Sequence, residues 1–269
     1  MKKKLSSAYM GIVMFFLYVP IFVLIVYSFN ESKSRAMFTG FTFDWYRQLF
    51  SNEMILTSLR NTLIVAIISS VVATVIGTAA ALGINNMNKR LRKLIMNVTY
   101  IPIINPEIVT GVSLMLLFVF LKLEFGFSTL ILAHITFNIP YVIFNVAPKL
   151  RQMDKYVYDA ARDLGCSPTQ AFFKVVIPEI MPGIMAGFLM AFTYSLDDFI
   201  ISYFTSGPSS QTLPITIFSM TRRKVSPEIN ALSTIIFVTV LSVLIIYNIY
   251  DARKEKLNRR PSNGGGSTI

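Results

Sequence analysis

Six stretches of the chain are apolar enough to cross a membrane as helices, since a helix needs about 20 apolar residues to span the hydrocarbon. Four of them contain no Lys, Arg, Asp or Glu: residues 5–30, 61–88, 125–148 and 229–250. Two more are long enough only if they tolerate internal acids: residues 94–121, with Glu107, and residues 180–204, with Asp197 and Asp198. The pattern predicts an all-α integral membrane protein with six transmembrane helices.

The composition leaves little polar surface with which to cover a soluble fold. Of the 269 residues, 54% are hydrophobic and only 14% are charged, and the mean hydropathy is +0.58. A soluble domain carries roughly 25% charged residues. The first apolar run is too long for the core of a secretory signal and lacks an A-x-A-like cleavage pattern, so we expect a retained transmembrane helix.

The basic residues are distributed in a way that predicts the topology. If the N-terminus is cytoplasmic, 17 of the 25 Lys and Arg residues fall in inside segments. Cytoplasmic loops carry such an excess of basic residues. The net charge of +11 is therefore mostly a topology signal, with both termini cytoplasmic, and we expect no nucleic-acid partner because the basic residues lie in short blocks beside the spans.

The single cysteine and the single histidine limit the chemistry of the chain. Cys166 alone excludes an internal disulfide and a cysteine metal cluster. His134 lies within the fourth stretch, near Asn138. A metal site or a histidine base would need partners that the chain does not supply, so we favour a packing histidine bonded to a neighbouring helix.

The inside segment 149–179 has the pattern of two short helices. Apolar residues at i, i+3, i+4 and i+7 form one face of the first helix: Val157, Ala160, Ala161 and Leu164. Asp154 is placed to cap its start, and Gly165 to end it in a left-handed turn. This segment is either an elbow that merely links two spans or a docking element, and its small Ala160-Ala161 step favours docking.

The second helix of this segment has its own start signal. Ser167 stands at the N-cap, Pro168 at the first helical position, and Gln170 completes a capping box. We expect interruptions of this helix around Pro178 and Pro182.

At this loop the chain resembles the permease subunits of type I ABC importers. Their motif is Glu-Ala-Ala, three residues, Gly, nine residues, Ile-x-Leu-Pro; here it reads Asp159-Ala160-Ala161, Gly165 and Val175 to Pro178, with the spacing intact. Asp replaces Glu at 159, which shortens the acid. The resemblance implies a MetI-like fold and a coupling helix that sits in a groove of an ATP-hydrolysing subunit, with Asp159, Ala160, Ala161, Gly165 and Pro178 as coupling residues.

The resemblance also implies the partners and the division of labour. The expected partners are an ABC ATPase dimer, a second homologous permease subunit, an extracytoplasmic polyamine-binding protein and the lipid bilayer of the bacterial inner membrane. This chain has no G-x-x-x-x-G-K-[ST] phosphate loop. We therefore expect a transport subunit without a cofactor of its own, with ATP and Mg bound in the partner ATPase.

The predicted spans, the loops between them and the Gly/Ser-rich end of the sequence divide the chain into four parts. They are an N-terminal transmembrane helix (1–30), an extracytoplasmic loop (31–59), a core transmembrane permease domain (60–251, with the coupling loop at 149–179) and a cytoplasmic tail (252–269) expected to be disordered.

Over nearly the whole chain the sequence is similar to the second permease of spermidine and putrescine importers. The stretches that carry this similarity are residues 159–165, 195–199, 204–208, 213–220 and 225–232. The resemblance implies polyamine transport; permeases for another small cationic solute share the coupling loop and remain the alternative. The sequence does not choose between spermidine and putrescine.

Acidic residues within the predicted spans are consistent with transport of a cationic substrate. Each costs about 2.5–3.5 kcal/mol at mid-membrane on insertion scales, so it normally faces a polar cavity or a partner. We expect Asp198, Asp197, Glu107 and Tyr194 to line the substrate pathway. The alternative is that Asp197 or Asp198 caps a loop or pairs with outside bases at residues 222–224.

Two other protein classes fit the sequence less well. An intramembrane aspartyl protease needs aspartates on separate spans, whereas Asp197 and Asp198 are adjacent. A stand-alone secondary transporter or channel would not explain the capped cytoplasmic elbow.

Overall fold

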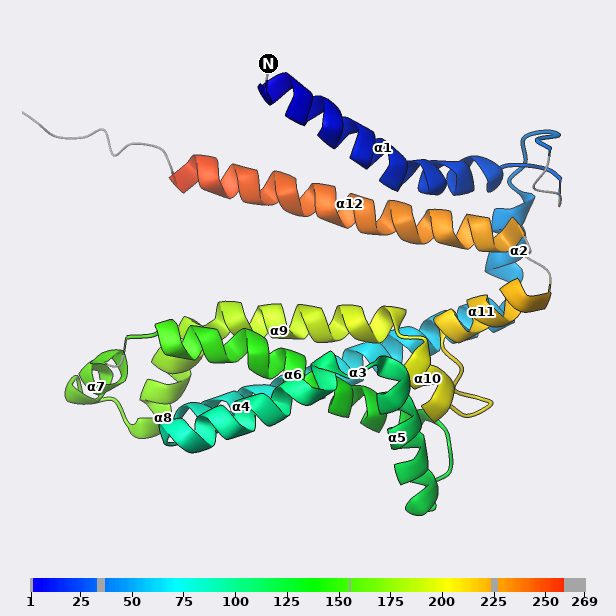
Figure 1. The fold of residues 1–269 in the computed structure, drawn as a ribbon. Coiled ribbons are helices and arrows are strands. Elements are labelled where there is room, and N and C mark those ends of the chain that lie inside the picture. Colours follow the sequence, from blue (N-terminus) through cyan, green and yellow to red (C-terminus); the bar gives the residue numbers. More distant parts are fainter. Residues whose placement is uncertain (1, 33–36, 155, 224–226, 259–269) are drawn as a thin grey trace, which may run out of the picture. The chain divides into compact units, whose positions relative to one another are not determined.

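The computed structural model describes residues 2–32, 37–154, 156–223 and 227–258. Its backbone contacts divide the chain into two units, Met1–Asn52 with Met220–Ile269 (unit 1) and Glu53–Ser219 (unit 2). The described residues form helices, together with one isolated bridge between Asn30 and Phe41 (Figure 1). The all-α prediction is confirmed.

Unit 1 contains α1 (Lys2–Tyr27), α2 (Asp44–Ser51) and α12 (Pro227–Asn258), and α12 packs against both others. The connection from α1 to α2 is fixed by Asn30, which is buried. The Asn30 side chain donates to the Met37 carbonyl (2.9 Å) and accepts from the Thr39 N–H (3.0 Å), while its carbonyl accepts from the Trp45 indole (2.7 Å). These bonds pair polar groups that are buried from water.

Unit 2 is built on three helices that pack together: α3 (Glu53–Asn85), α6 (Phe127–Gln152) and α9 (Ile177–Asp197). Small residues let the backbones approach closely, as in other membrane bundles. Gly187 lies so near the α6 backbone that an added Cβ would be 3.1 Å from the Val142 Cα. At Gly183 an added Cβ would be 2.8 Å from the Asn145 carbonyl oxygen.

The third predicted span is not straight. It consists of α4 (Lys89–Ile104) and α5 (Glu107–Phe120), which are bent by 101° at Asn105-Pro106. Pro106 lacks a backbone N–H and disfavours the helical conformation of the residue before it. Asn105 accordingly has an extended backbone (φ −69°, ψ 137°).

Helices occupy all six predicted stretches, but the number of crossings remains a prediction. Among the described residues, four helices are long and apolar enough to cross a membrane: Tyr9–Tyr27, Glu53–Asn85, Phe127–Gln152 and Pro168–Asp197. The bent pair would be a fifth, and Pro227–Ser242 in α12 is a shorter apolar helix. α12 continues to Asn258, into the segment that we expected to be disordered; residues 259–269 lie outside the described residues.

Between α6 and α9 lie α7 (Tyr156–Asp163), α8 (Pro168–Ala171) and a π-helical turn (Phe172–Val176) that leads directly into α9. The expected interruptions at Pro178 and Pro182 are wrong, since both residues lie within α9. Pro178 is in the first turn of α9, and the irregular backbone lies just before it. After α9 come α10 (Ile200–Thr205) and α11 (Leu213–Arg223).

Within unit 2, α7 and α8 lie at one end, and α5 and α10 lie at the other (Figure 1). α9 runs from the first end to the second as 21 helical residues. At 1.5 Å per residue it is about 30 Å long. One helix therefore connects the loop between α6 and α9 with the acids at Asp197 and Asp198.

Candidate coupling surface and translocation site

The elbow, residues 153–176, contains α7, and both ends of α7 have the predicted caps. The Asp154 carboxylate accepts the Tyr156 N–H (3.0 Å) at the start of the helix. Gly165 has a φ of +87°, the left-handed conformation that favours glycine. Its N–H donates to the Arg162 carbonyl (3.0 Å) and the Cys166 N–H donates to the Ala161 carbonyl (3.1 Å), which is the hydrogen-bond pair of a Schellman motif.

The start of α8 is also as predicted. The Ser167 hydroxyl accepts the Gln170 N–H (3.2 Å), and the Gln170 side chain accepts the Ser167 N–H (3.0 Å). Pro168 occupies the first turn, where no N–H is needed. Both short helices therefore have well-defined ends, and α7 packs against α8 and the π-helical turn.

The predicted apolar face of α7 is divided between core and surface. Ala161 is buried, whereas Ala160 is exposed and Leu164 is 87% exposed. Tyr156, one turn before Ala160, is 76% exposed. The i, i+4 spacing of Tyr156 and Ala160 could have identified Tyr156 from the sequence. The elbow thus presents apolar side chains outward at the end of unit 2, as expected of a surface that contacts another protein.

The other proposed coupling residues belong to the same elbow or follow it. Asp159 is an exposed residue of α7, and Gly165 is exposed at the end of that helix. Pro178 is exposed in the first turn of α9, beyond the π-helical turn. An exposed acid at 159 is available to an external partner.

Asp198 lies at the break between α9 and α10 and is buried, with its side chain only 3% exposed. Its carboxylate accepts two backbone N–H groups of α10, from Ile201 (3.2 Å) and Ser202 (2.7 Å). The Nε2 atom of His134 is 3.5 Å from the Asp198 Oδ2. The Asp198 carboxylate thus caps the start of α10.

His134 is the packing histidine that we expected. Its Nε2 atom is also 3.1 Å from the Ser202 hydroxyl, so α6 is bonded to α10. One turn further along α6, Asn138 donates to the Ser195 hydroxyl (2.8 Å), which also bonds Ser69 of α3 (3.1 Å). These buried polar side chains fasten the break after Asp197 to the three central helices.

An acid–aromatic cluster lies beside this break and consists of Glu107, Asp197, Phe137, Tyr141 and Tyr194. Glu107 is the first residue of α5, directly after the 101° bend, and it interacts electrostatically with Asp198 and Asp197. Glu107 and Asp197 are exposed in the isolated chain. The bend therefore brings a carboxylate of the third predicted span close to those of the fifth.

Aromatic rings form the other part of the cluster. The ring centroids of Tyr141 and Tyr194 are 4.4 Å apart, and Phe137 packs edge-on against Tyr194 at 6.1 Å. Tyr141 also interacts electrostatically with Glu107. Sequence reasoning found Tyr194 but missed Phe137 and Tyr141, although their i, i+4 spacing places them on one face of α6.

Membrane-crossing helices, a capped elbow with outward apolar side chains and intramembrane acids together define a membrane transport subunit. Residues 73–260 match the family described as "Binding-protein-dependent transport system inner membrane component", and the chain belongs to this family. The family consists of membrane transport components, so the expectations of a multi-pass inner-membrane protein and of a transport subunit rather than an enzyme are confirmed.

Two relatives specify the kind of permease. The chain is 36% identical over 254 residues to the spermidine/putrescine transport system permease protein PotC of Escherichia coli K12, covering 94% of this chain and 96% of that protein. It is 38% identical over 248 residues to the putrescine transport system permease protein PotI of the same organism, covering 90% and 88%. The resemblance to a PotC-type ABC permease is thereby confirmed.

The fold has a counterpart among solved structures. A chain of the bacterial alginate ABC transporter, crystallised in complex with an alginate pentasaccharide-bound periplasmic protein, matches with a TM-score of 0.69 over 93% of each chain at 18% identity. Such low identity shows a shared fold alone. The prediction of an ABC-importer permease fold is confirmed.

Proposed function

We propose that this chain is a permease subunit of an ABC importer for polyamines, spermidine and/or putrescine, and forms half of the translocation pathway with a homologous permease. The observation that carries the substrate class is the acid–aromatic cluster. Glu107 and Asp197 are carboxylates in predicted membrane spans that interact with each other, and Glu107 also interacts with Tyr141, whose ring is paired with that of Tyr194.

The chemistry of this cluster suits an aliphatic chain with several ammonium groups. Carboxylates attract the ammonium groups strongly where water is scarce. Tyrosine faces add cation–π attraction and apolar contact for the methylene segments. Asp198 interacts electrostatically with Glu107, while its own carboxylate oxygens remain bonded to backbone N–H groups of α10. In this proposal Glu107, Asp197 and Tyr194 contact the substrate, and Asp198 acts mainly from behind them.

The energy for transport comes from partner subunits. An ABC ATPase dimer binds ATP and Mg and receives the elbow through Ala160, Leu164 and their neighbours. An extracytoplasmic polyamine-binding protein delivers the substrate to the outward side. The elbow and both termini lie in the cytoplasm, as the distribution of basic residues predicts.

The test is uptake by the full transporter complex reconstituted in proteoliposomes with its binding protein. Radiolabelled spermidine, putrescine and lysine are compared at equal concentration, with ATP inside. ATP-dependent uptake of either polyamine above that of lysine supports the proposal. Uptake of lysine but of neither polyamine would establish the alternative, a permease for another small cationic solute.

A further inference from the structure

A groove rich in basic side chains lies at the turn between α3 and α4. One pocket, of about 590 Å³, is lined by Asn88, Lys89, Arg90, Leu91 and Leu94. A second, of about 340 Å³, is lined by Lys89, Arg92, Lys93, Met96, Asn97 and Arg151. Because Lys89 lines both, they form one continuous surface, here called the cationic groove.

The positive charge of the cationic groove is not neutralised by nearby acids. Neither pocket is lined by Asp or Glu. None of its five Lys and Arg side chains forms a salt bridge within the part of the chain that the structure describes. Arg92 is half-buried and forms no salt bridge within the described residues. An external anion would complement this unneutralised positive charge.

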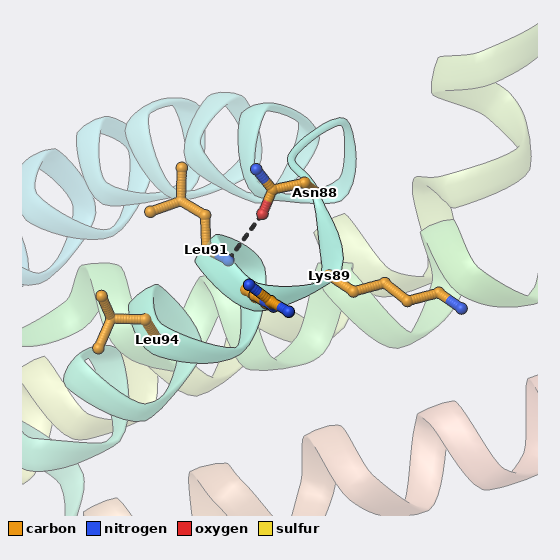
Figure 2. Close-up of a pocket in the computed structure, with 5 residues that line it drawn as sticks. Asn88, Lys89, Leu91 and Leu94 are labelled. Carbon is orange, nitrogen blue, oxygen red and sulfur yellow. Dashed lines mark hydrogen bonds between the residues drawn. The ribbon is translucent and has the colours of Figure 1, made fainter.

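The groove also has apolar walls. Leu91 and Leu94 are 42% and 60% exposed, and Met96 lines the second pocket. Figure 2 shows Leu91 and Leu94 on the same side of the first turns of α4, whereas the Lys89 side chain extends the other way. The Asn88 side chain accepts the Leu91 N–H (2.9 Å) and so fixes this turn.

We propose that the cationic groove binds the headgroup of an anionic phospholipid of the cytoplasmic leaflet. Basic pockets beside transmembrane helices suit such headgroups. The exposed leucines favour a lipid over free phosphate, because only a lipid has acyl chains to cover them. Arg151 lies in the last turn of α6, just before the elbow, so the bound headgroup is placed next to the coupling element. The assignment to the cytoplasmic leaflet depends on the proposed function, which gives the orientation of the chain. The preference for an anionic lipid does not depend on it.

The experiment measures lipid binding and is independent of transport. The purified full transporter complex, stripped of lipid in detergent, is titrated with phosphatidylglycerol or with phosphatidylcholine of the same acyl chains. Native mass spectrometry gives the affinity for the first bound lipid. We expect preference for phosphatidylglycerol, and a loss of about 30-fold in Lys89→Gln/Arg92→Gln, since two basic residues are removed.

Matched variants separate a site from general surface charge. Lys149→Gln/Lys174→Gln removes two exposed basic residues from the same predicted side and should change the affinity less than twofold. Lys89→Arg/Arg92→Lys keeps the charge and should retain binding, which assigns the loss in Lys89→Gln/Arg92→Gln to the missing charge.

Four results would overturn the proposal. The first is an equal loss of lipid affinity in Lys89→Gln/Arg92→Gln and Lys149→Gln/Lys174→Gln, and the second is no preference for the anionic lipid. The third is displacement of the lipid by millimolar inorganic phosphate. The fourth is release of the ATPase subunit by Lys89→Gln/Arg92→Gln without loss of lipid. The third would make the site one for free phosphate, and the last would make the groove a protein interface.

Discussion

At the scale of residues, Asp197 and Asp198 show how neighbours in sequence take different roles. α9 ends at Asp197, and consecutive helical residues point about 100° apart. Asp198 turns inward, where two backbone N–H groups and His134 surround its carboxylate. Asp197 remains exposed near Glu107. Asp197 is accessible from outside the chain, as the proposed contact with substrate requires, whereas Asp198 holds the break between α9 and α10.

Removing charge from the acid–aromatic cluster should weaken substrate handling without unfolding the protein. For Glu107→Gln and for Asp197→Asn we expect polyamine uptake to fall about tenfold or more, mainly through a higher KM, because each change removes a charged partner of an ammonium group. Initial uptake rates of radiolabelled spermidine in proteoliposomes give KM and the maximal rate. Glu124→Gln, an exposed acid outside the cluster, is the control. Normal uptake in both cluster variants would remove these acids from the pathway.

Changing Asp198 should act first on stability. Asp198→Ala leaves two buried N–H groups without their acceptor, which costs about 1–3 kcal/mol for each unsatisfied group. Asp198→Asn keeps one oxygen acceptor and should cost less. The unfolding temperatures of the purified complexes show which of the two variants is less stable, and we expect this to be Asp198→Ala. Equal, wild-type unfolding temperatures for both would show that the capping bonds do not stabilise the chain.

At the scale of elements, α9 connects the elbow to the acid–aromatic cluster without an intervening loop. Its first turn follows the π-helical turn, and its last residue is Asp197. The contact of α9 with α6 depends on glycines, so the helix is held by backbone packing over its N-terminal half. In the proposed function, displacement of the elbow is transmitted along about 30 Å of helix to the acid–aromatic cluster.

The packing of α9 on α6 can be tested with one methyl group. Gly183→Ala would place its Cβ 2.8 Å from the Asn145 carbonyl oxygen, so we expect a loss of about 1–3 kcal/mol from overpacking. Gly83→Ala in α3 is the matched control, because nothing lies within 4 Å of its added Cβ. That change should be neutral or stabilise by about 0.5–1 kcal/mol through helix propensity. Thermal unfolding compares the two, and a Gly183→Ala protein as stable as Gly83→Ala would contradict the close packing.

At the scale of the whole molecule, the sequence predicted what depends on local patterns. Apolar stretches located the helices, and single residues such as Asp154, Gly165 and Ser167 located the ends of the elbow helices, because caps are formed between neighbours in sequence. The resemblance to the coupling motif likewise depends on residues close in sequence, with their types and spacing intact on a predicted inside segment.

Features that depend on distant contacts were not predicted. The 101° bend at Asn105-Pro106 depends on how α5 packs against α10. The approach of Tyr141 to Tyr194 joins α6 to α9, and the burial of Asp198 depends on His134, 64 positions earlier. Such pairings are set by tertiary packing, which a single sequence does not display.

In the proposed function, the elbow transmits the action of a separate ATPase through α9 to the substrate site. The most direct test measures ATP hydrolysis stimulated by the binding protein, together with polyamine uptake, in the reconstituted complex carrying Leu164→Glu. The control is Leu123→Glu, an exposed position in the short connection between α5 and α6. We predict that Leu164→Glu lowers both activities at least tenfold and weakens co-purification of the ATPase subunit, whereas Leu123→Glu retains them. Wild-type hydrolysis, uptake and attachment with Leu164→Glu would contradict the claim.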